Sequence, residues 1–190
     1  MKTKNSENNF SETKLSENLA YLLGLFEGDG YEWTGTFGIT NRNPQILERA
    51  SKILSNFGEV RIRKDQIGAY RVCIVGNPLY RNFKEKMKMF KGKLTSNKNF
   101  ICVYFAGKYD ADGSKWKDRI RFKITYGHRK QILFDKNLLL SIGIESKIRD
   151  YKDRNANDLE IASYNAFMFY EMIRNSSIKL CPIRTIKLVP

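Results

Sequence analysis

The chain has 190 residues, enough for one large domain or two smaller ones and for burial of roughly two-thirds of its unfolded surface. Hydrophobic residues make up 42% and no apolar run nears the roughly 18 residues that cross a bilayer, so we expect neither a disordered nor a membrane protein. A formal net charge of +14, from 34 Lys and Arg against 20 acidic residues, makes nucleic acid the leading partner.

The first part of the chain divides into a leader and a repeat. Residues 1–15 are polar and lack the apolar core of a secretory signal, which predicts a flexible leader. Residues 16–92 form the first predicted repeat. Its expected helices cover residues 16–28, 44–57 and 78–90, and its expected strands cover residues 32–40, 59–64 and 69–75.

The second part of the chain follows the same order of elements. A linker over residues 93–97 leads to a second predicted repeat over residues 98–175, and residues 176–190 form a tail without a clear pattern. The expected helices cover residues 99–110, 129–141 and 164–174, and the expected strands cover residues 115–126, 144–151 and 159–163. Each half indicates an αββαββα unit, so the fold class is α+β with tandem, pseudo-symmetric repeats.

The strongest internal similarity occurs at an offset of 83 residues. Residues 20–30 (AYLLGLFEGDG) align with residues 103–113 (VYFAGKYDADG), with Tyr, Gly, Asp and Gly in the same places. On a helix, Gly24 and Gly107 each lie in a stripe of small side chains four residues apart. If the two stripes pack together, Asp29 and Asp112 emerge side by side at one end.

Two interpretations of these aspartates are open. An Asp-Gly pair after a helix can be a simple C-terminal turn, with glycine in the left-handed conformation. However, an acid at a helix C-terminus opposes the helix dipole, and two acids brought together repel. A divalent cation between Asp29 and Asp112 offsets both effects, since Mg²⁺ and Ca²⁺ prefer oxygen ligands.

The segments LLGLFEGDG (residues 22–30) and FAGKYDADG (residues 105–113) resemble the LAGLIDADG motif of homing endonucleases, matching five and six of its nine letters. Leu23, Lys108 and Tyr109 depart from the motif, so we expect imperfect or asymmetric helix packing. The resemblance implies a monomer of the two-motif, single-chain type. It also implies two curved antiparallel sheets that form a DNA-binding saddle, with the motif helices packed at its centre.

The resemblance implies further that Asp29 and Asp112 hold the metal with the main-chain carbonyls of Gly28 and Ala111. The expected cofactor is Mg²⁺, with Mn²⁺ or Ca²⁺ able to take the same sites. Three polar or basic residues are expected to assist the chemistry by ordering water or binding phosphate: Asn41, Arg42 and Lys115.

Basic side chains alternate with apolar ones along the predicted strands, as on a sheet with one charged face. The candidate DNA-binding residues are Arg61, Arg63, Arg71, Lys117, Arg119, Arg121, Lys123, Lys147 and Arg149. A solvated face is the bland interpretation. Because the faces are nearly single-signed, and like charges on neighbouring strands repel, we favour a surface that grips phosphates and base edges.

The histidine and cysteine content narrows the chemistry and the compartment. His128 is the only histidine, which excludes zinc sites of the HExxH type and leaves carboxylates to carry the reaction. The three cysteines are widely spaced, form no CxxC pair and cannot all pair with one another. We therefore expect an intracellular, reducing compartment, such as the cytoplasm, the nucleoid or an organelle matrix.

The predicted function is a site-specific, metal-dependent double-strand DNA endonuclease of the intron-homing kind. Two sheets with strands of about seven residues span a weakly symmetric target of about 14 to 20 base pairs. The alternatives are an RNA maturase that acts on its own intron and a nucleic-acid-binding protein without cleavage. An enzyme acting on a small anionic substrate is disfavoured, since it would leave the two basic sheets unexplained.

Overall fold

The computed structural model describes residues 17–33, 35–64, 68–75, 77–116, 120–151 and 156–180. The predicted leader, the tail beyond residue 180, and the candidate residues Lys117 and Arg119 lie outside this part of the chain. Two successive αββαββα units make up the described structure, which confirms the predicted α+β class and its repeat.

The first unit contains three helices and a four-stranded antiparallel sheet in the order β1-β2-β4-β3. The helix α2 begins where Asn43 accepts a hydrogen bond from the backbone N–H of Gln45 and Pro44 occupies the first turn, as expected of a helix start. The elements are α1 (Glu17–Asp29), β1 (Gly30–Trp33), β2 (Thr36–Asn41), α2 (Pro44–Leu54), β3 (Val60–Lys64), β4 (Tyr70–Val75) and α3 (Asn77–Lys93).

The second unit repeats this arrangement with the sheet order β5-β6-β8-β7. A short 3₁₀ helix, η1 (Leu94–Ser96), joins the units, and the side chain of Asn97 caps the helix that follows. The elements are α4 (Lys98–Asp112), β5 (Gly113–Lys115), β6 (Arg121–Tyr126), α5 (Arg129–Leu140), β7 (Lys147–Asp150), β8 (Asn157–Ala162) and α6 (Ser163–Ile173).

Six predicted helices are confirmed to within a few residues, but the two longest predicted strands are wrong. Residues 32–40 form the two arms of the hairpin β1–β2, near whose turn Gly35 has a positive φ of 69°. Residues 115–126 likewise contain the end of β5 and all of β6. Strand-forming residues occupy both arms of each hairpin, so alternation alone does not reveal the turn between them.

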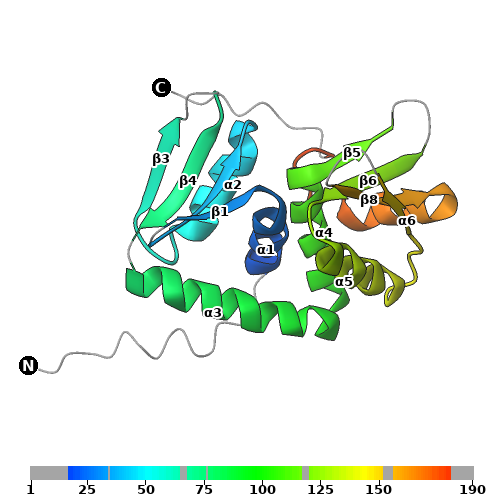
Figure 1. The fold of residues 1–190 in the computed structure, drawn as a ribbon, viewed down its shortest axis with the longest axis horizontal. Helices are drawn as coiled ribbons and strands as arrows, with labels where there is room; N and C mark the ends of the chain where they lie inside the picture. Colours follow the sequence, from blue (N-terminus) through cyan, green and yellow to red (C-terminus); the bar gives the residue numbers. More distant parts are fainter. Residues whose placement is uncertain are drawn as a thin grey trace, which may run out of the picture.

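The helices α1 and α4 lie side by side at the centre of the molecule, with one sheet on either side (Figure 1). The helix α3 runs beneath both. Buried residues of both units, including Leu22, Phe37, Phe105 and Phe122, belong to one continuous hydrophobic core. Among the described helices, none has the length and apolar character needed to cross a membrane.

Candidate metal centre and nucleic-acid interface

The small residues of α1 and α4 bring the two helix backbones into direct contact. A Cβ atom added to Gly24 would lie 1.9 Å from the carbonyl oxygen of Tyr104. A Cβ atom added to Gly107 would lie 2.1 Å from the carbonyl oxygen of Tyr21. Only glycine fits at either position, and the predicted face-to-face packing of the two stripes is confirmed.

This packing brings the C-terminal ends of α1 and α4 together. A Cβ atom on Gly28 would lie 2.4 Å from Asp112 Oδ2 and 2.5 Å from the Cβ atom of Ala111. Burial raises the pKa of Asp29 to about 6, and the Asp112 charge adds to this while a hydrogen bond from Asn41 opposes it. Burial also raises the pKa of Asp112. The two carboxylates therefore lie in one half-buried site, where the charge of Asp112 disfavours ionisation of Asp29.

The two acids have different neighbours, so the halves of the site are not equivalent. The Asn41 side-chain amide donates a hydrogen bond to Asp29 Oδ2. The strand register makes Tyr126 the counterpart of Asn41, because Gly30 pairs with Ile39 as Gly113 pairs with Ile124. The hydroxyl of Tyr126 donates instead to Asp135 Oδ2 at 2.7 Å.

Positive charges flank Asp112 in place of an amide. Against the effect of burial, the ammonium groups of Lys108 and Lys179 lower its pKa. Lys179 donates from Nζ to the carbonyl oxygens of Ala111 at 2.9 Å, Gly113 at 3.2 Å and Tyr109 at 3.3 Å. Its ammonium group thus covers the negative end of the α4 dipole, beside both acids. Sequence analysis missed Lys179, since residues 176–190 carry no periodic pattern.

The donor atoms at the ends of α1 and α4 fit a hard divalent cation. They comprise the carboxylates of Asp29 and Asp112 and nearby carbonyl oxygens, which are the ligands that Mg²⁺, Mn²⁺ and Ca²⁺ prefer. No group of three or more His, Cys, Asp or Glu side chains that could hold a metal occurs in the described part of the chain. A bound ion would therefore complete its coordination with carbonyls, water and substrate oxygens.

The structure brings one of the three predicted assisting residues to an acid. Asn41 contacts Asp29, whereas Arg42 is exposed at the end of β2. Lys115 lies on the face of β5 that is turned toward α6, with its ammonium group 5.9 Å from the ring centres of Phe122 and Tyr170.

The outer face of the first sheet, the face turned away from the helices, is basic. Cross-strand pairing places Arg63 opposite Arg71 and Arg61 opposite Cys73, and all three arginines are exposed. No carboxylate shares this face among the described residues of β1 to β4, although Glu59, just before β3, pairs with Arg61 at 3.3 Å. Ile62, which lies between Arg61 and Arg63 and faces the opposite side of β3, is 63% exposed.

The outer face of the second sheet is not single-signed, so that prediction is wrong for this half. Asp158 and Glu160 of β8 lie among the basic residues of β6 and β7. The ion pairs are Lys123–Asp158 at 3.2 Å, Arg149–Glu160 at 3.0 Å and Arg121–Glu160 at 3.6 Å, and Lys147 is opposite Glu160. The predicted strand began only at residue 159 and no charged face was assigned to it, so the acidic residues Asp158 and Glu160 were missed.

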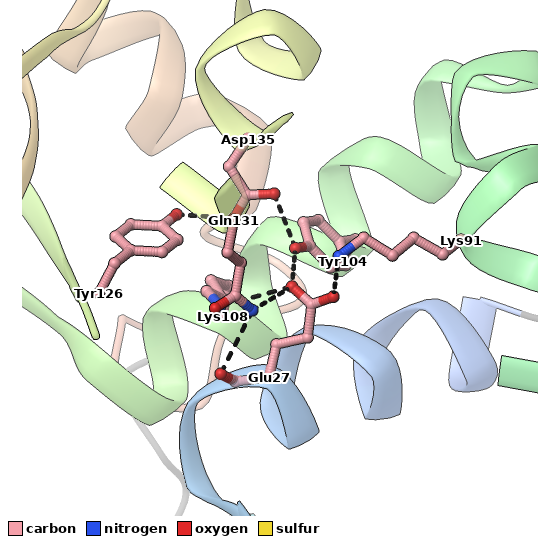
Figure 2. A network of polar contacts seen from close by, with 7 residues as sticks. All are labelled: Glu27, Lys91, Tyr104, Lys108, Tyr126, Gln131 and Asp135. Atoms are coloured by element: carbon pink, nitrogen blue, oxygen red, sulfur yellow. Dashed lines mark hydrogen bonds and ion pairs between the residues drawn. The ribbon is translucent and has the colours of Figure 1, made fainter. Parts of the chain in front are cut away.

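A buried polar network behind the acids joins the two repeats (Figure 2). Glu27 of α1 accepts hydrogen bonds from Tyr104 at 2.5 Å and Gln131 at 2.6 Å, and pairs with Lys91 at 2.5 Å and Lys108 at 3.5 Å. Burial raises the pKa of Glu27, but the charges of Lys108 and Lys91 outweigh it and hold the pKa below its usual value. Lys108, a departure from the motif, is 1% exposed and belongs to this network.

Asp110, the counterpart of Glu27 in the second repeat, anchors a C-terminal segment. Its buried carboxylate accepts hydrogen bonds from Tyr21 at 2.8 Å, Ser177 Oγ at 2.6 Å, and the backbone N–H groups of Ile178 at 2.7 Å and Lys179 at 2.9 Å. These contacts hold the ammonium group of Lys179 in the site.

A family model for a LAGLIDADG-like domain matches residues 16–88. A search of curated proteins finds no match. Among solved structures, I-DmoI in complex with DNA and Mn aligns at a TM-score of 0.68 and 19% identity, over 84% of this chain and 97% of that chain. I-DmoI with DNA and Ca gives the same TM-score and identity, over 83% and 89% of the two chains.

The fold is shared with a second group of solved structures. Full-length DUF199/WhiA from Thermatoga maritima aligns at a TM-score of 0.65 and 15% identity, over 86% of this chain and 57% of that chain. The matched residues contain the first motif, and the two sheets have the same strand order. Residues 16–88 are therefore a LAGLIDADG-like domain, and the described chain has the two-repeat fold that it shares with I-DmoI.

Proposed function

We propose that this protein is a site-specific DNA endonuclease of the intron-homing kind that hydrolyses both strands of a long, weakly symmetric target with divalent metal. The observation that carries the proposal is the convergence of Asp29 and Asp112 at the ends of two glycine-packed helices, between two sheets. Carboxylates that repel phosphate are a poor choice at the centre of a surface that only binds nucleic acid, and a good one for holding Mg²⁺.

The roles proposed for the central residues follow from their positions. Asp29 and Asp112, with the carbonyls of Gly28 and Ala111, hold the metal. A divalent ion supplies polarisation of the scissile phosphate and lowers the pKa of a water molecule. Asn41 orients the Asp29 carboxylate through its hydrogen bond. Arg42 and Lys115 serve as phosphate-binding or water-ordering groups at greater distance.

The DNA would lie along the outer faces of both sheets. Arg61, Arg63 and Arg71 present an exposed basic surface in the first half. The second half would use the following residues, with Asp158 and Glu160 interspersed: Lys117, Arg119, Arg121, Lys123, Lys147 and Arg149. Asp158 and Glu160 are buried under their ion pairs with Lys123 and Arg149 and neutralise part of the basic charge, so the second half is expected to bind phosphate less strongly than the first.

The comparisons support a DNA target and a divalent metal, because I-DmoI, which shares the fold, was solved with DNA and with Mn or Ca. Two motifs in one chain support a monomer. A reducing compartment inside the cell is proposed from the wide spacing of the three cysteines in the sequence.

The second candidate is a protein of the same fold that binds DNA, or its own intron RNA as a maturase, without cleaving. One observation favours it. Lys179 already donates a hydrogen bond to the Ala111 carbonyl, which is one of the proposed metal ligands. An ammonium group at this place would compensate the charge of the two acids without a metal.

Cleavage of uninterrupted host-gene DNA separates the two candidates. We expect double-strand cuts with Mg²⁺, none with chelator, and none in Asp29→Asn or Asp112→Asn, while both variants still bind the DNA. The matched control is Asp150→Asn, since Asp150 is an exposed acid on β7 that pairs with Arg129. If Asp29→Asn and Asp112→Asn both cut at the parent rate, these aspartates have no part in the mechanism. If the parent protein binds the DNA but does not cut it, the second candidate is favoured.

A further inference from the structure

The two tryptophans of the chain occupy the same place in the two repeats. Trp33 and Trp116 are the only tryptophans, and their separation is the repeat offset of 83 residues. Each is the third residue after the glycine that follows Asp29 or Asp112, as in Gly30-Tyr-Glu-Trp33 and Gly113-Ser-Lys-Trp116. A shared position in two sequences that otherwise diverge points to a shared task.

The strand registers place both side chains on the outer faces of the sheets. Trp33 pairs with Thr36, which pairs with Val75, two residues along β4 from Cys73 and on the same face as Arg71. In the second sheet, the Trp116 backbone N–H donates to the Arg121 carbonyl at 3.0 Å, and the Arg121 guanidinium lies 5.4 Å from the centre of the Trp116 ring.

Both indole rings are open to solvent. Trp33 is 75% exposed and Trp116 is 38% exposed. Leaving large aromatic surface in water forgoes the stabilisation that its burial gives, so an equivalent pair on the outer faces of the two sheets indicates a partner that covers both. The exposed Arg61, Arg63 and Arg71, on the outer face that also carries Trp33, favour a negatively charged partner.

We propose that Trp33 and Trp116 contact the major-groove edge of duplex DNA, one in each half-site, through apolar contact with thymine methyl groups and sugars. Trp33 lies four residues beyond Asp29, and Trp116 lies four residues beyond Asp112. Four residues of extended strand span at most about 13 Å, which corresponds to about four base pairs on either side of the centre of the target. The inference rests on the proposed DNA target and adds two residues, and a preference for thymine, to it. Duplex RNA does not suit, because its major groove is too narrow to admit the rings.

Tryptophan fluorescence tests the inference directly, since each single variant leaves one reporter. Trp33→Phe reports on Trp116, and Trp116→Phe reports on Trp33. A duplex pool of random sequence, about 20 base pairs long and labelled for anisotropy, is titrated into each variant in chelator at low salt. We expect the emission of both variants to change, and acrylamide quenching to fall, in step with the rise in anisotropy.

The affinity of alanine variants provides a second measurement. Trp33→Ala and Trp116→Ala are each expected to weaken duplex binding roughly tenfold without changing its salt dependence, because no charge is removed. Arg63→Ala should reduce the salt slope by about one. The matched control is Tyr164→Ala, which removes a 73% exposed aromatic from α6, and its affinity should stay at the parent value.

The possible failures are distinct. If the anisotropy does not rise with any duplex, the proposed DNA target is wrong. If it rises while either tryptophan keeps its emission and its acrylamide accessibility, the target stands and this inference is overturned. Protection of both rings by duplex RNA but not by duplex DNA would also overturn it.

Discussion

Without a bound metal, the charges of Asp29 and Asp112 destabilise the folded protein. Burial opposes the ionisation of both, and the charge of Asp112 also opposes that of Asp29. Asn41, Lys108 and Lys179 partly offset these effects. Replacing either aspartate with a neutral residue is therefore expected to increase the free energy of unfolding in the absence of metal.

The first prediction concerns the stability of Asp29→Asn without metal. The folded protein raises the pKa of Asp29 from 3.8 to about 6, so it binds the proton more tightly than the unfolded chain does. The resulting stabilisation is complete below about pH 4 and is lost as the pH rises through 6. Asp29→Asn should therefore be more stable than the parent above pH 6, by about 1–2 kcal/mol after allowance for solvent screening.

Urea denaturation in chelator between pH 4 and pH 8 measures this difference. The gap between variant and parent should close toward pH 4. Added Mg²⁺ should stabilise the parent above pH 6 and should not stabilise the variant to the same extent. A variant that is less stable than the parent at pH 7 in chelator would contradict the assignment of a repulsive site.

At the scale of elements, the contact between α1 and α4 decides where the acids lie. The second prediction is that Gly24→Ala or Gly107→Ala forces the helices apart, because the new Cβ atom meets backbone, which cannot move aside as a side chain can. We expect a loss of about 3 kcal/mol in the free energy of unfolding, and a larger loss of metal affinity than of stability.

Gly92→Ala is the matched control for these substitutions. Gly92 lies in α3 and a Cβ atom there would meet nothing within 4 Å, so the change should stabilise the protein by about 0.5–1 kcal/mol. Equal stabilities of Gly24→Ala and Gly92→Ala in thermal or urea denaturation would show that the α1–α4 contact is looser than described.

The sequence was sufficient to predict these helices because the small stripe repeats at helical spacing beside an Asp-Gly pair. The hairpins β1–β2 and β5–β6 were not predicted, since each turn is short and the strand pattern continues through it. The acids of β8 were missed for a related reason. Whether a basic face is neutralised depends on strand pairing, and Lys123 and Asp158 lie 35 residues apart in the chain.

At the scale of the whole molecule, polar contacts tie the repeats into one unit. The third prediction concerns Glu27→Gln, which keeps the shape of the side chain and removes its charge. The ammonium group of Lys108, 1% exposed, then loses its nearest counter-charge. We expect a loss of about 3 kcal/mol in the free energy of unfolding. Lys91 and Gln131 remain to contact the substituted side chain, so unfolding should still be a single cooperative transition.

Glu48→Gln is the control, because Glu48 pairs with Lys52 on the surface of α2 and its loss should cost less than about 1 kcal/mol. Lys108→Met combined with Glu27→Gln should recover part of the stability, because the buried ammonium group that had lost Glu27 is removed as well. If Glu27→Gln costs no more than Glu48→Gln, the network is not a link between the repeats.

The anchoring of residues 177–179 by Asp110 has a consequence for how the protein matures. A ribosome completes both motif helices more than sixty residues before it makes Ser177, so until then the Asp110 carboxylate has the Tyr21 hydroxyl but lacks its donors from residues 177–179. The order of synthesis thus delays assembly around the two acids until residues 177–179 have been made, and a polypeptide released before them by a premature stop codon would lack the Lys179 ammonium group beside Asp29 and Asp112.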